Sequence, residues 1–236
     1  MNRLQAEQRR LYLLPERASE AGVLIDAQGR VRAMVVDVAQ QAGWDAVAAL
    51  CHGLQNELAL PTPAIAVSGG AGFQVWLSLA EPVLVADAQA FLDAVRRRFM
   101  GQVPARQVQT KPTAQPMGHA RLVPELQGET GRWSAFVAPG LASMFADEPW
   151  LDVPPGADAQ AQLLSRLESI SVADLARAQS ELGLTDAHVT RDAEPAGGPS
   201  TSVRTETDPR RFLLSVMNDP AVDMSLRIEA AKALLP

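Results

Sequence analysis

Cysteine and histidine are scarce in this sequence, and their scarcity excludes several classes of site. The 236 residues include a single cysteine, Cys51, which excludes an intramolecular disulfide framework and a cysteine-based zinc site. The three histidines, His52, His119 and His188, are far apart and form no pair at the helical spacing of a zinc site. We therefore expect no metal and no resident cofactor, and the cysteine usage suits a reducing compartment.

Long hydrophobic runs and an excess of positive charge are also missing. No segment approaches the roughly 18 apolar residues of a membrane span, and the first thirty residues lack the order of a signal peptide. We expect a cytoplasmic protein with no membrane contact. The net charge of −6 argues against binding nucleic acid through overall charge, although a local basic surface stays open.

Hydrophobic periodicity in the first 150 residues predicts alternating strands and helices. Spacings of three and four predict helices, and alternating or β-branched runs bounded by turn residues predict strands. The predicted helices cover residues 3–14, 44–58 and 88–99, and the predicted strands cover 23–25, 31–38, 64–68, 73–79, 104–110 and 119–123. Asp87 is the expected N-cap of the third helix, and Glu81-Pro82 is expected to end the strand before it.

This order of elements predicts an α+β fold. A hairpin, a helix, a second hairpin, a helix and a strand contain the β-α-β-β-α-β core of ferredoxin-like and RNA-recognition-like domains, with an extra N-terminal strand. Two helices are expected to cover one face of the sheet and to leave the other face open for binding. A helical C-terminal region should follow this core.

Composition divides the chain into four parts. Residues 1–150 form the predicted open-faced sheet domain, and residues 151–184 form a helical extension that includes a capping box at Ser171. Residues 185–207 contain almost no large apolar side chains, which predicts a flexible linker. Residues 208–236 predict a two-helix appendage that is too small for a core of its own, so we expect it to dock on a protein partner.

The segment from Ser68 to Val83, SGGAGFQVWLSLAEPV, is the most informative in the chain. It resembles the hairpin of the primase-polymerase (archaeo-eukaryotic primase) superfamily, where a Ser-Gly-x-Gly-x-His-x-Trp-like sequence precedes a Glu-Pro turn. Asp37 in Val-Val-Asp-Val stands where that family has its acidic strand, and Arg121 in Ala-Arg-Leu-Val-Pro resembles a later family strand. The resemblance covers about residues 30–140 and implies nucleotide or nucleic-acid chemistry on the open face.

The departures from that family bear on catalysis. Transfer of a nucleotide by two metal ions needs several clustered carboxylates, but the acid expected two residues after Asp37 is absent. Gln74 replaces the family's histidine, and the strand at 104–110 lacks the third acid. The resemblance therefore implies a degenerate member with Asp37 as a remnant catalytic acid, and Mg²⁺ would bind only if activity survives. Asp26 and Glu81 are the candidates for relocated acids.

Strand alternation assigns the side chains of the second hairpin to two faces. Phe73, Val75, Leu77 and Leu79 are assigned to the core, and Gln74, Trp76 and Ser78 to the open face. Trp76 then either stacks a base or covers apolar sheet surface beneath a later segment. Asp37 is either a remnant metal ligand or a buried acid paired with an arginine. His119 and Arg121 share a face and either grip phosphate or are locally bonded and solvated.

Positive charge is concentrated in one stretch of this acidic chain. Residues 96–132 carry a net charge of +5, which leaves −11 on the rest of the chain. A basic stripe that includes Arg106 and Arg121 would suit contact with a nucleic-acid backbone. The alternative is that three of these charges cap a helix end and the others are scattered.

These observations lead to three hypotheses of function. The first is a catalytically inactive primase-polymerase-like protein of a bacterial mobile element that binds single-stranded DNA or RNA weakly, or a nucleotide, through Gln74, Trp76, Arg106, His119 and Arg121. The second is a protein interaction module of a replication or conjugation complex. It draws support from residues 208–236, which resemble the tails of phage terminase small subunits. The third is a nucleotidyl transferase with relocated acids.

Overall fold

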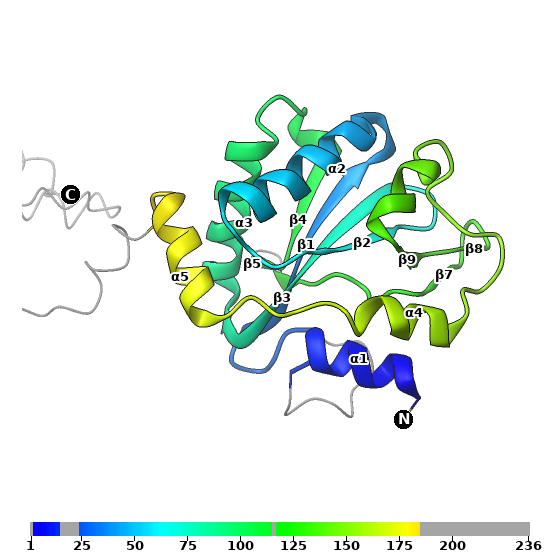
Figure 1. Ribbon diagram of the computed structural model, residues 1–236, viewed down its shortest axis with the longest axis horizontal. Helices are drawn as coiled ribbons and strands as arrows, with labels where there is room; N and C mark the ends of the chain where they lie inside the picture. Colours follow the sequence, from blue (N-terminus) through cyan, green and yellow to red (C-terminus); the bar gives the residue numbers. More distant parts are fainter. Residues whose placement is uncertain (1, 15–23, 115–116, 185–236) are drawn as a thin grey trace, which may run out of the picture. The chain divides into compact units, whose positions relative to one another are not determined.

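The computed structural model describes residues 2–14, 24–114 and 117–184 (Figure 1). The linker predicted at 185–207 and the appendage predicted at 208–236 lie outside the described residues. The first of two compact units spans Met1–Asp192, and the description below concerns this unit alone. No helix among the described residues is both long and apolar enough to cross a membrane.

The main sheet has five antiparallel strands in the order β4-β1-β3-β2-β9. Its strands are β1 (Arg30–Ala39), β2 (Ala64–Val67), β3 (Gly72–Leu84), β4 (Val108–Lys111) and β9 (Ala135–Val137). Two short hairpins lie outside it: β5 (Thr113–Ala114) with β6 (Met117–Gly118), and β7 (Leu126–Gln127) with β8 (Arg132–Trp133). The mixed α+β class predicted from the sequence is confirmed.

Helices connect and flank these strands. The helices are α1 (Arg3–Leu11), α2 (Gly43–His52), α3 (Val85–Phe99), α4 (Ala157–Leu164) and α5 (Val172–Glu181). Shorter helical turns are η2 (Gln40–Ala42), the π-helical η3 (Gly53–Glu57), η4 (Ala105–Gln107) and η5 (Pro139–Phe145). Ser171 caps α5 by accepting a hydrogen bond from the Asp174 amide, as its capping-box sequence predicts.

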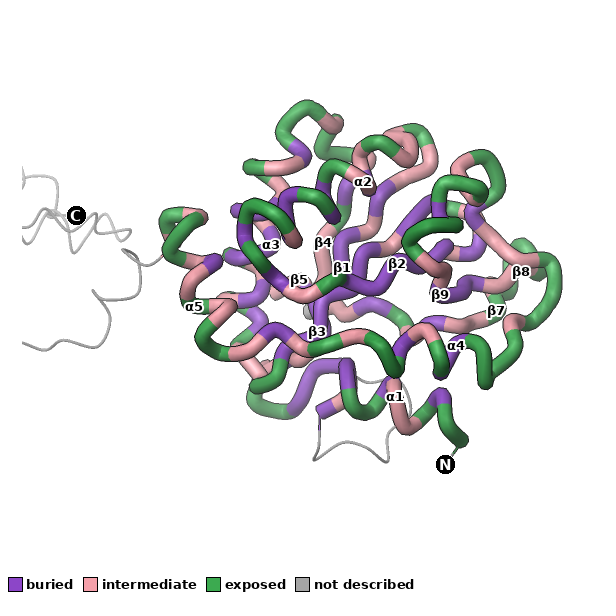
Figure 2. Tube along the Cα trace, in the orientation of Figure 1, coloured by how far each residue is buried: buried purple, intermediate pink, exposed green. Residues whose placement is uncertain are grey.

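The sheet separates two hydrophobic clusters, as the alternation along β3 predicts. Phe73, Val75 and Leu77 belong to the larger cluster, which is formed with α2 and α3. Trp76 belongs to the smaller cluster on the opposite face, together with Tyr12 of the segment after α1 and residues of α4. The strands are largely buried in Figure 2, because both of their faces are covered over much of their length.

The second face of the sheet is therefore not open in the way the sequence led us to expect. Helices α1 and α4 contact each other and cover the part of this face that lies near Trp76 (Figure 1). Arg10 of α1 donates hydrogen bonds to the carbonyl oxygens of Leu164 and Leu167, which ties the N-terminal helix to the end of α4. Among the described residues, the part of the face around Asp37 is accessible, since it lines a pocket.

Several predicted boundaries were wrong. Strand β3 continues through Glu81-Pro82 to Leu84 and pairs with the start of β1 across a bulge, so it leads directly into α3. Leu84 rather than Asp87 is the N-cap of α3. The extra N-terminal strand is reduced, among the described residues, to a single bridge between Ile25 and Val31.

Three errors concern the strands after α3. The segment predicted as a strand at 104–110 begins with the helical turn η4, and only β4 pairs with β1. Residues 119–123 form no strand. The edge strand β9, which pairs with β2, was not predicted because its three residues are too short for a periodic signal.

The turn before β1 is organised by Asp26. Its buried carboxylate accepts hydrogen bonds from the backbone amides of Gln28 and Arg30 and pairs with the Arg30 guanidinium at 2.8 Å. Burial alone would raise the pKa of this carboxyl, but the hydrogen bonds and charge of Arg30, with the Gln28 amide, lower it below the ordinary value of 3.8. The ionised carboxylate therefore stabilises the folded state.

We expect Asp26→Asn to lose about 1.5–3 kcal/mol of unfolding free energy at pH 7, because hydrogen bonds to a charged group are lost. A depressed folded-state pKa contributes stability above the unfolded-state pKa, and this contribution disappears as pH falls through the folded-state value. Urea unfolding at pH 7, 5 and 3.5 should show the two proteins converging only below about pH 4. An equal difference at all three values would contradict this role.

Candidate functional site

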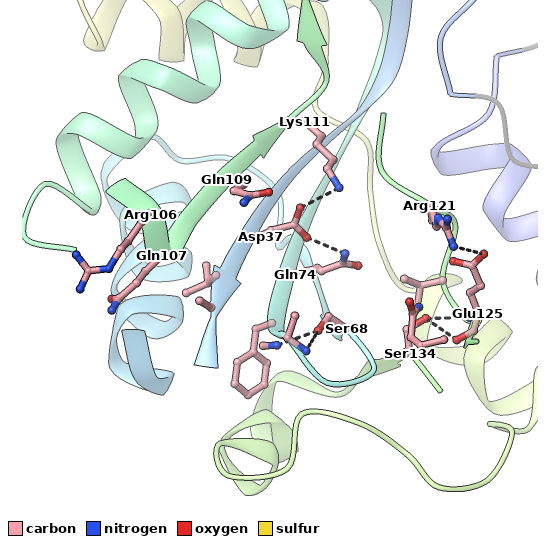
Figure 3. A pocket seen from close by; sticks show the side chains of 17 residues that line it. Asp37, Ser68, Gln74, Arg106, Gln107, Gln109, Lys111, Arg121, Glu125 and Ser134 are labelled. Atoms are coloured by element: carbon pink, nitrogen blue, oxygen red, sulfur yellow. Dashed lines mark hydrogen bonds and ion pairs between the residues drawn. The ribbon is translucent and has the colours of Figure 1, made fainter. Parts of the chain in front are cut away.

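The accessible part of the second sheet face contains a pocket of about 310 Å³ at the ends of β1, β3 and β4 (Figure 3). Loops that precede β7 and β9 form its other wall. The polar and charged residues that line it are Asp37, Ser68, Gln74, Arg106, Gln107, Gln109, Lys111, Arg121, Glu125, Gln127 and Ser134. This volume is at the lower end of the range for small-molecule sites.

Asp37 lies at the centre of the pocket because strand register places it there. It is opposite Gln74 of β3 on one side and Gln109 of β4 on the other. Gln74 Nε2 donates a hydrogen bond to Asp37 Oδ1 at 2.7 Å, and Lys111 Nζ lies 3.4 Å from Oδ2. Both carboxylate oxygens of Asp37 therefore have partners within the protein.

Gln74 also connects the pocket to the covered part of the sheet. Its Oε1 accepts a hydrogen bond from Trp76 Nε1 at 3.1 Å, and this bond fixes which end of the amide faces Asp37. Trp76 is 1% exposed, so the Trp76-Gln74-Asp37 chain begins in the smaller hydrophobic cluster. The position of the Asp37 carboxylate is therefore set by this hydrogen-bonded chain from the buried Trp76, as well as by the pairing of the strands.

Glu125 occupies the opposite wall of the pocket (Figure 3). Its Oε1 lies 3.4 Å from Arg121 Nη1, whose side chain is 76% exposed. Its Oε2 is buried and has no hydrogen-bond partner in the part of the chain that the structure describes. The backbone beneath is fixed, because the Glu125 amide donates to Ser134 Oγ at 2.8 Å and the Ser134 amide donates to the Glu125 carbonyl.

A second hollow of about 620 Å³ adjoins the pocket. The glycine turn between β2 and β3 forms one wall, residues 127–130 form the other, and Arg121 and Gln127 border both hollows. Ser68 Oγ accepts hydrogen bonds from the Ala71 and Gly72 amides, both at 2.9 Å. Because these two amides are already bonded, the glycines serve the hairpin turn.

Four of the six site residues predicted from the sequence meet in the pocket: Asp37, Gln74, Arg106 and Arg121. Trp76 does not, and its predicted role in base stacking was wrong for this conformation. Tyr12 and Phe136 lie over it, with ring centroids 5.0 Å and 6.0 Å away, which matches the alternative that it covers sheet surface beneath another segment. His119 does not line the pocket, and its Nδ1 lies 2.7 Å from the Ala120 carbonyl oxygen.

The positive charges of residues 96–132 do not all face the pocket. Arg96, Arg97 and Arg98 lie in the last turn of α3, which packs on the other face of the sheet, and Arg98 pairs with Glu57 at 3.0 Å. The Arg132 guanidinium lies 3.5 Å from the centre of the Trp150 ring. Of the seven cationic side chains of residues 96–132, three line the pocket: Arg106, Lys111 and Arg121.

The donor set does not fit two divalent metal ions. Asp37 and Glu125 are the only carboxylates among the lining residues, and Asp37 is held by a lysine and an amide. Among the described residues, no group of three or more histidine, cysteine or acidic side chains is placed to hold a metal. The candidate relocated acids do not help, since neither Asp26 nor Glu81 lines the pocket.

Sequence reasoning missed part of the site. Lys111 follows Gln109 by two residues on β4, so an extension of the strand pattern by one residue would have placed both on one face. Glu125, Gln127 and Ser134 lie in or beside short irregular strands and loops. No periodic signal marks such segments, and only the fold brings them to the pocket.

Comparison with known proteins adds no assignment. The chain matches no known protein-family model, and no curated protein is significantly similar to it in sequence.

Gly72, which lines the pocket, permits a close approach between β3 and β1. A Cβ atom at this position would lie 2.1 Å from the Val38 carbonyl oxygen, and its φ is +144°. Gly70 has a similar φ of +142° but open space around the position of a Cβ. A comparison of alanine substitutions at Gly70 and Gly72 therefore distinguishes the cost of a steric clash from the cost of backbone strain.

We expect Gly70→Ala to cost about 1–3 kcal/mol of unfolding free energy from backbone strain. Gly72→Ala should cost clearly more, since the hairpin must also move away from β1. Urea unfolding of both variants measures the difference. Equal losses would show that the contact with Val38 imposes no additional constraint.

Proposed function

We propose that this protein is a primase-polymerase-like domain that binds a nucleotide, either free or at the end of a single strand, without joining nucleotides. One observation carries the proposal. The pocket gathers three cationic side chains and several amides around a single central carboxylate, Asp37, that is already paired with Lys111. Such a site suits binding of a phosphate-bearing ligand and lacks the acids for transfer.

The cations are arranged to receive an anion. Arg106 lies beyond Asp37 on one side, and Arg121 lies on the other side (Figure 3). Arginine matches phosphate geometry through its planar set of donors, and both of these side chains are exposed. The contact of Lys111 with Asp37 is long and partly exposed, at 3.4 Å, so it opposes a shift of the ammonium toward phosphate only weakly.

The remaining lining side chains suit a sugar and a base. Amides can both donate and accept hydrogen bonds, and the side chains of Gln107, Gln109 and Gln127 make no hydrogen bond to another residue in the described part of the chain. A phosphate alone would require donors only. The mixed set therefore supports a nucleotide over inorganic phosphate.

The resemblance found in the sequence supports the same function. Asp37 and Gln74, which stand at two motif positions, face each other across β1 and β3 and share a hydrogen bond. The strand order β4-β1-β3-β2, with α2 and α3 as the crossovers, supports the ferredoxin-like core that this family has. The origin in a bacterial mobile element and the cytoplasmic location remain parts of the proposal.

The second candidate, a protein interaction module, rests on a different surface. Residues of β9, η5 and α4 border an apolar groove of about 450 Å³ that includes Leu141, whose side chain is exposed. Met144 of η5 is also exposed, at 77%. This surface suits an apolar segment of a partner in a replication or conjugation complex, and the two functions can coexist.

We expect the protein to bind a labelled single-stranded oligonucleotide weakly and with strong dependence on salt. Contact of three cations with phosphates should give a slope near −2 for the logarithm of affinity against the logarithm of salt, at roughly 0.7 per contact. Arg106→Ala with Arg121→Ala should reduce the slope to about one third, measured by fluorescence anisotropy.

Arg9→Ala with Arg97→Ala is the matched control, because both arginines are exposed and lie outside the pocket. This double variant should keep the slope of the unmodified protein. An equal reduction in both double variants, or no binding of nucleotide or oligonucleotide at low salt, would exclude the pocket as the binding site.

We also expect no primer synthesis or extension when the protein is given template, nucleoside triphosphates and Mg²⁺ or Mn²⁺. The donor set around Asp37 cannot hold two ions at the separation that nucleotidyl transfer needs. Gel analysis of labelled products measures this. Template-dependent product that disappears in Asp37→Ala would contradict the proposal and favour the transferase hypothesis.

A further inference from the structure

The apolar groove of about 450 Å³ lies beside β9, an edge strand of the main sheet. Its walls are formed by β9, the helical turn η5, Leu151 and α4, which contacts β9 (Figure 1). Arg166 is the one charged residue among the described residues that line the groove, and its side chain forms no ion pair or hydrogen bond with them or with the rest of the described chain. The groove therefore combines apolar walls with an unpaired positive charge.

The outer edge of β9 is closed to an added strand. The Gln160 side chain accepts a hydrogen bond from the Phe136 amide at 2.8 Å and donates one to the Phe136 carbonyl at 2.9 Å. Phe136 is the middle residue of the three in β9, and Gln160 is 5% exposed. An extended peptide would need these two backbone groups in order to pair with the strand. The occupant of the groove therefore enters it with side chains.

An exposed apolar side chain lies beside the groove on the same helical turn. Leu141 and Met144 are three residues apart in η5, and side chains at this spacing lie on one side of a 3₁₀ helix. Leu141 lines the groove, and Met144 is 77% exposed, more than any other large hydrophobic side chain in the described part of the chain. One surface therefore presents both an apolar groove and an apolar projection.

The charges that follow this projection are opposite in sign to the charge of the groove. Asp147 and Glu148 come shortly after Met144, and both are exposed. Neither carboxylate forms an ion pair or hydrogen bond within the described residues. Arg166 of the groove is exposed and unpaired in the same way. The projection of one molecule and the groove of another are therefore complementary in both polarity and charge.

We propose that this surface binds a second copy of the chain in a two-fold symmetric dimer. Such a dimer requires a surface that is complementary to itself, and a groove next to a matching projection meets this requirement. Met144 of each copy enters the groove of the other copy, where a flexible thioether side chain fills an irregular apolar space well. Arg166 of each copy then faces Asp147 and Glu148 of the other.

This inference goes beyond nucleotide binding and deepens the second candidate function. It rests on that candidate because it takes the groove to be a docking site, and it names the partner. It does not depend on the nucleotide pocket, since the groove and the pocket around Asp37 share no lining residue.

Sedimentation velocity of the full chain from low micromolar to submillimolar concentration tests the inference. The unmodified protein should change from monomer to dimer within this range, since a small contact surface gives a weak, transient dimer. Met144→Lys should weaken the dimer at least about tenfold, because it places an unpaired charge in an apolar groove beside Arg166. Val172→Lys is the matched control and should leave the dimer unchanged, because Val172 is 62% exposed and does not line the groove.

Charge reversal tests the pairing across the dimer. Arg166→Glu should weaken the dimer roughly threefold or more, since like charges then face each other. Asp147→Lys with Glu148→Lys should weaken it to a similar extent. All three substitutions in one chain should restore most of the lost affinity, because opposite charges face each other again. The three positions are exposed, so the folded monomer should tolerate these changes.

The outcomes that would overturn the inference are distinct. A protein that stays monomeric at every concentration would overturn it and leave nucleotide binding untouched. A dimer that neither Met144→Lys nor the charge reversals weaken would place the interface elsewhere and overturn it as well. A monomer that binds an apolar segment of a different protein in the groove would exclude a second copy as the occupant and keep the second candidate function. Failure of oligonucleotide and nucleotide binding would overturn the proposed function alone.

Discussion

The two side-chain hydrogen bonds of Gln74 connect the pocket to the smaller hydrophobic cluster. One end of its amide donates to Asp37 in the pocket, and the other end accepts from Trp76 beneath α1 and α4. A single polar side chain on β3 therefore links an accessible site to a buried aromatic cluster. The burial of Trp76 limits how far Gln74 can rotate, and Gln74 in turn limits how Asp37 is presented.

The covering of the second sheet face explains where the site can be. A sheet with two helices on one side would leave the whole of the opposite side accessible, but Tyr12, Phe136 and α4 occupy the half that contains Trp76. What is left is a confined pocket, walled by the loops around Glu125 and Ser134. The covering therefore leaves a confined pocket of about 310 Å³ in place of the open sheet face that the sequence predicts.

The charge of the pocket differs in sign from the net charge of the chain. An acidic chain with a net charge of −6 places three of its cations around two carboxylates, so the pocket is locally positive. Asp37 is neutralised by Lys111, whereas one oxygen of Glu125 is not neutralised or bonded within the described residues. The two carboxylates thus have different surroundings: both oxygens of Asp37 have partners, whereas only one oxygen of Glu125 has a partner among the described residues.

The meeting of Asp37 with Gln74, Arg106 and Arg121 was suggested by the family resemblance and the basic stripe, since Arg106 and Arg121 lie on no strand. The sequence by itself determined the α+β class and the two faces of β3. These features depend on local periodicity and on strand pairing, which spacing and side-chain type encode directly. Only the tertiary structure decided that Trp76 is covered, that His119 lies outside the pocket and that Glu125 and Ser134 lie within it. Those outcomes depend on how α1, α4 and irregular loops pack over the sheet, and contacts between distant segments leave no periodic signal in the chain.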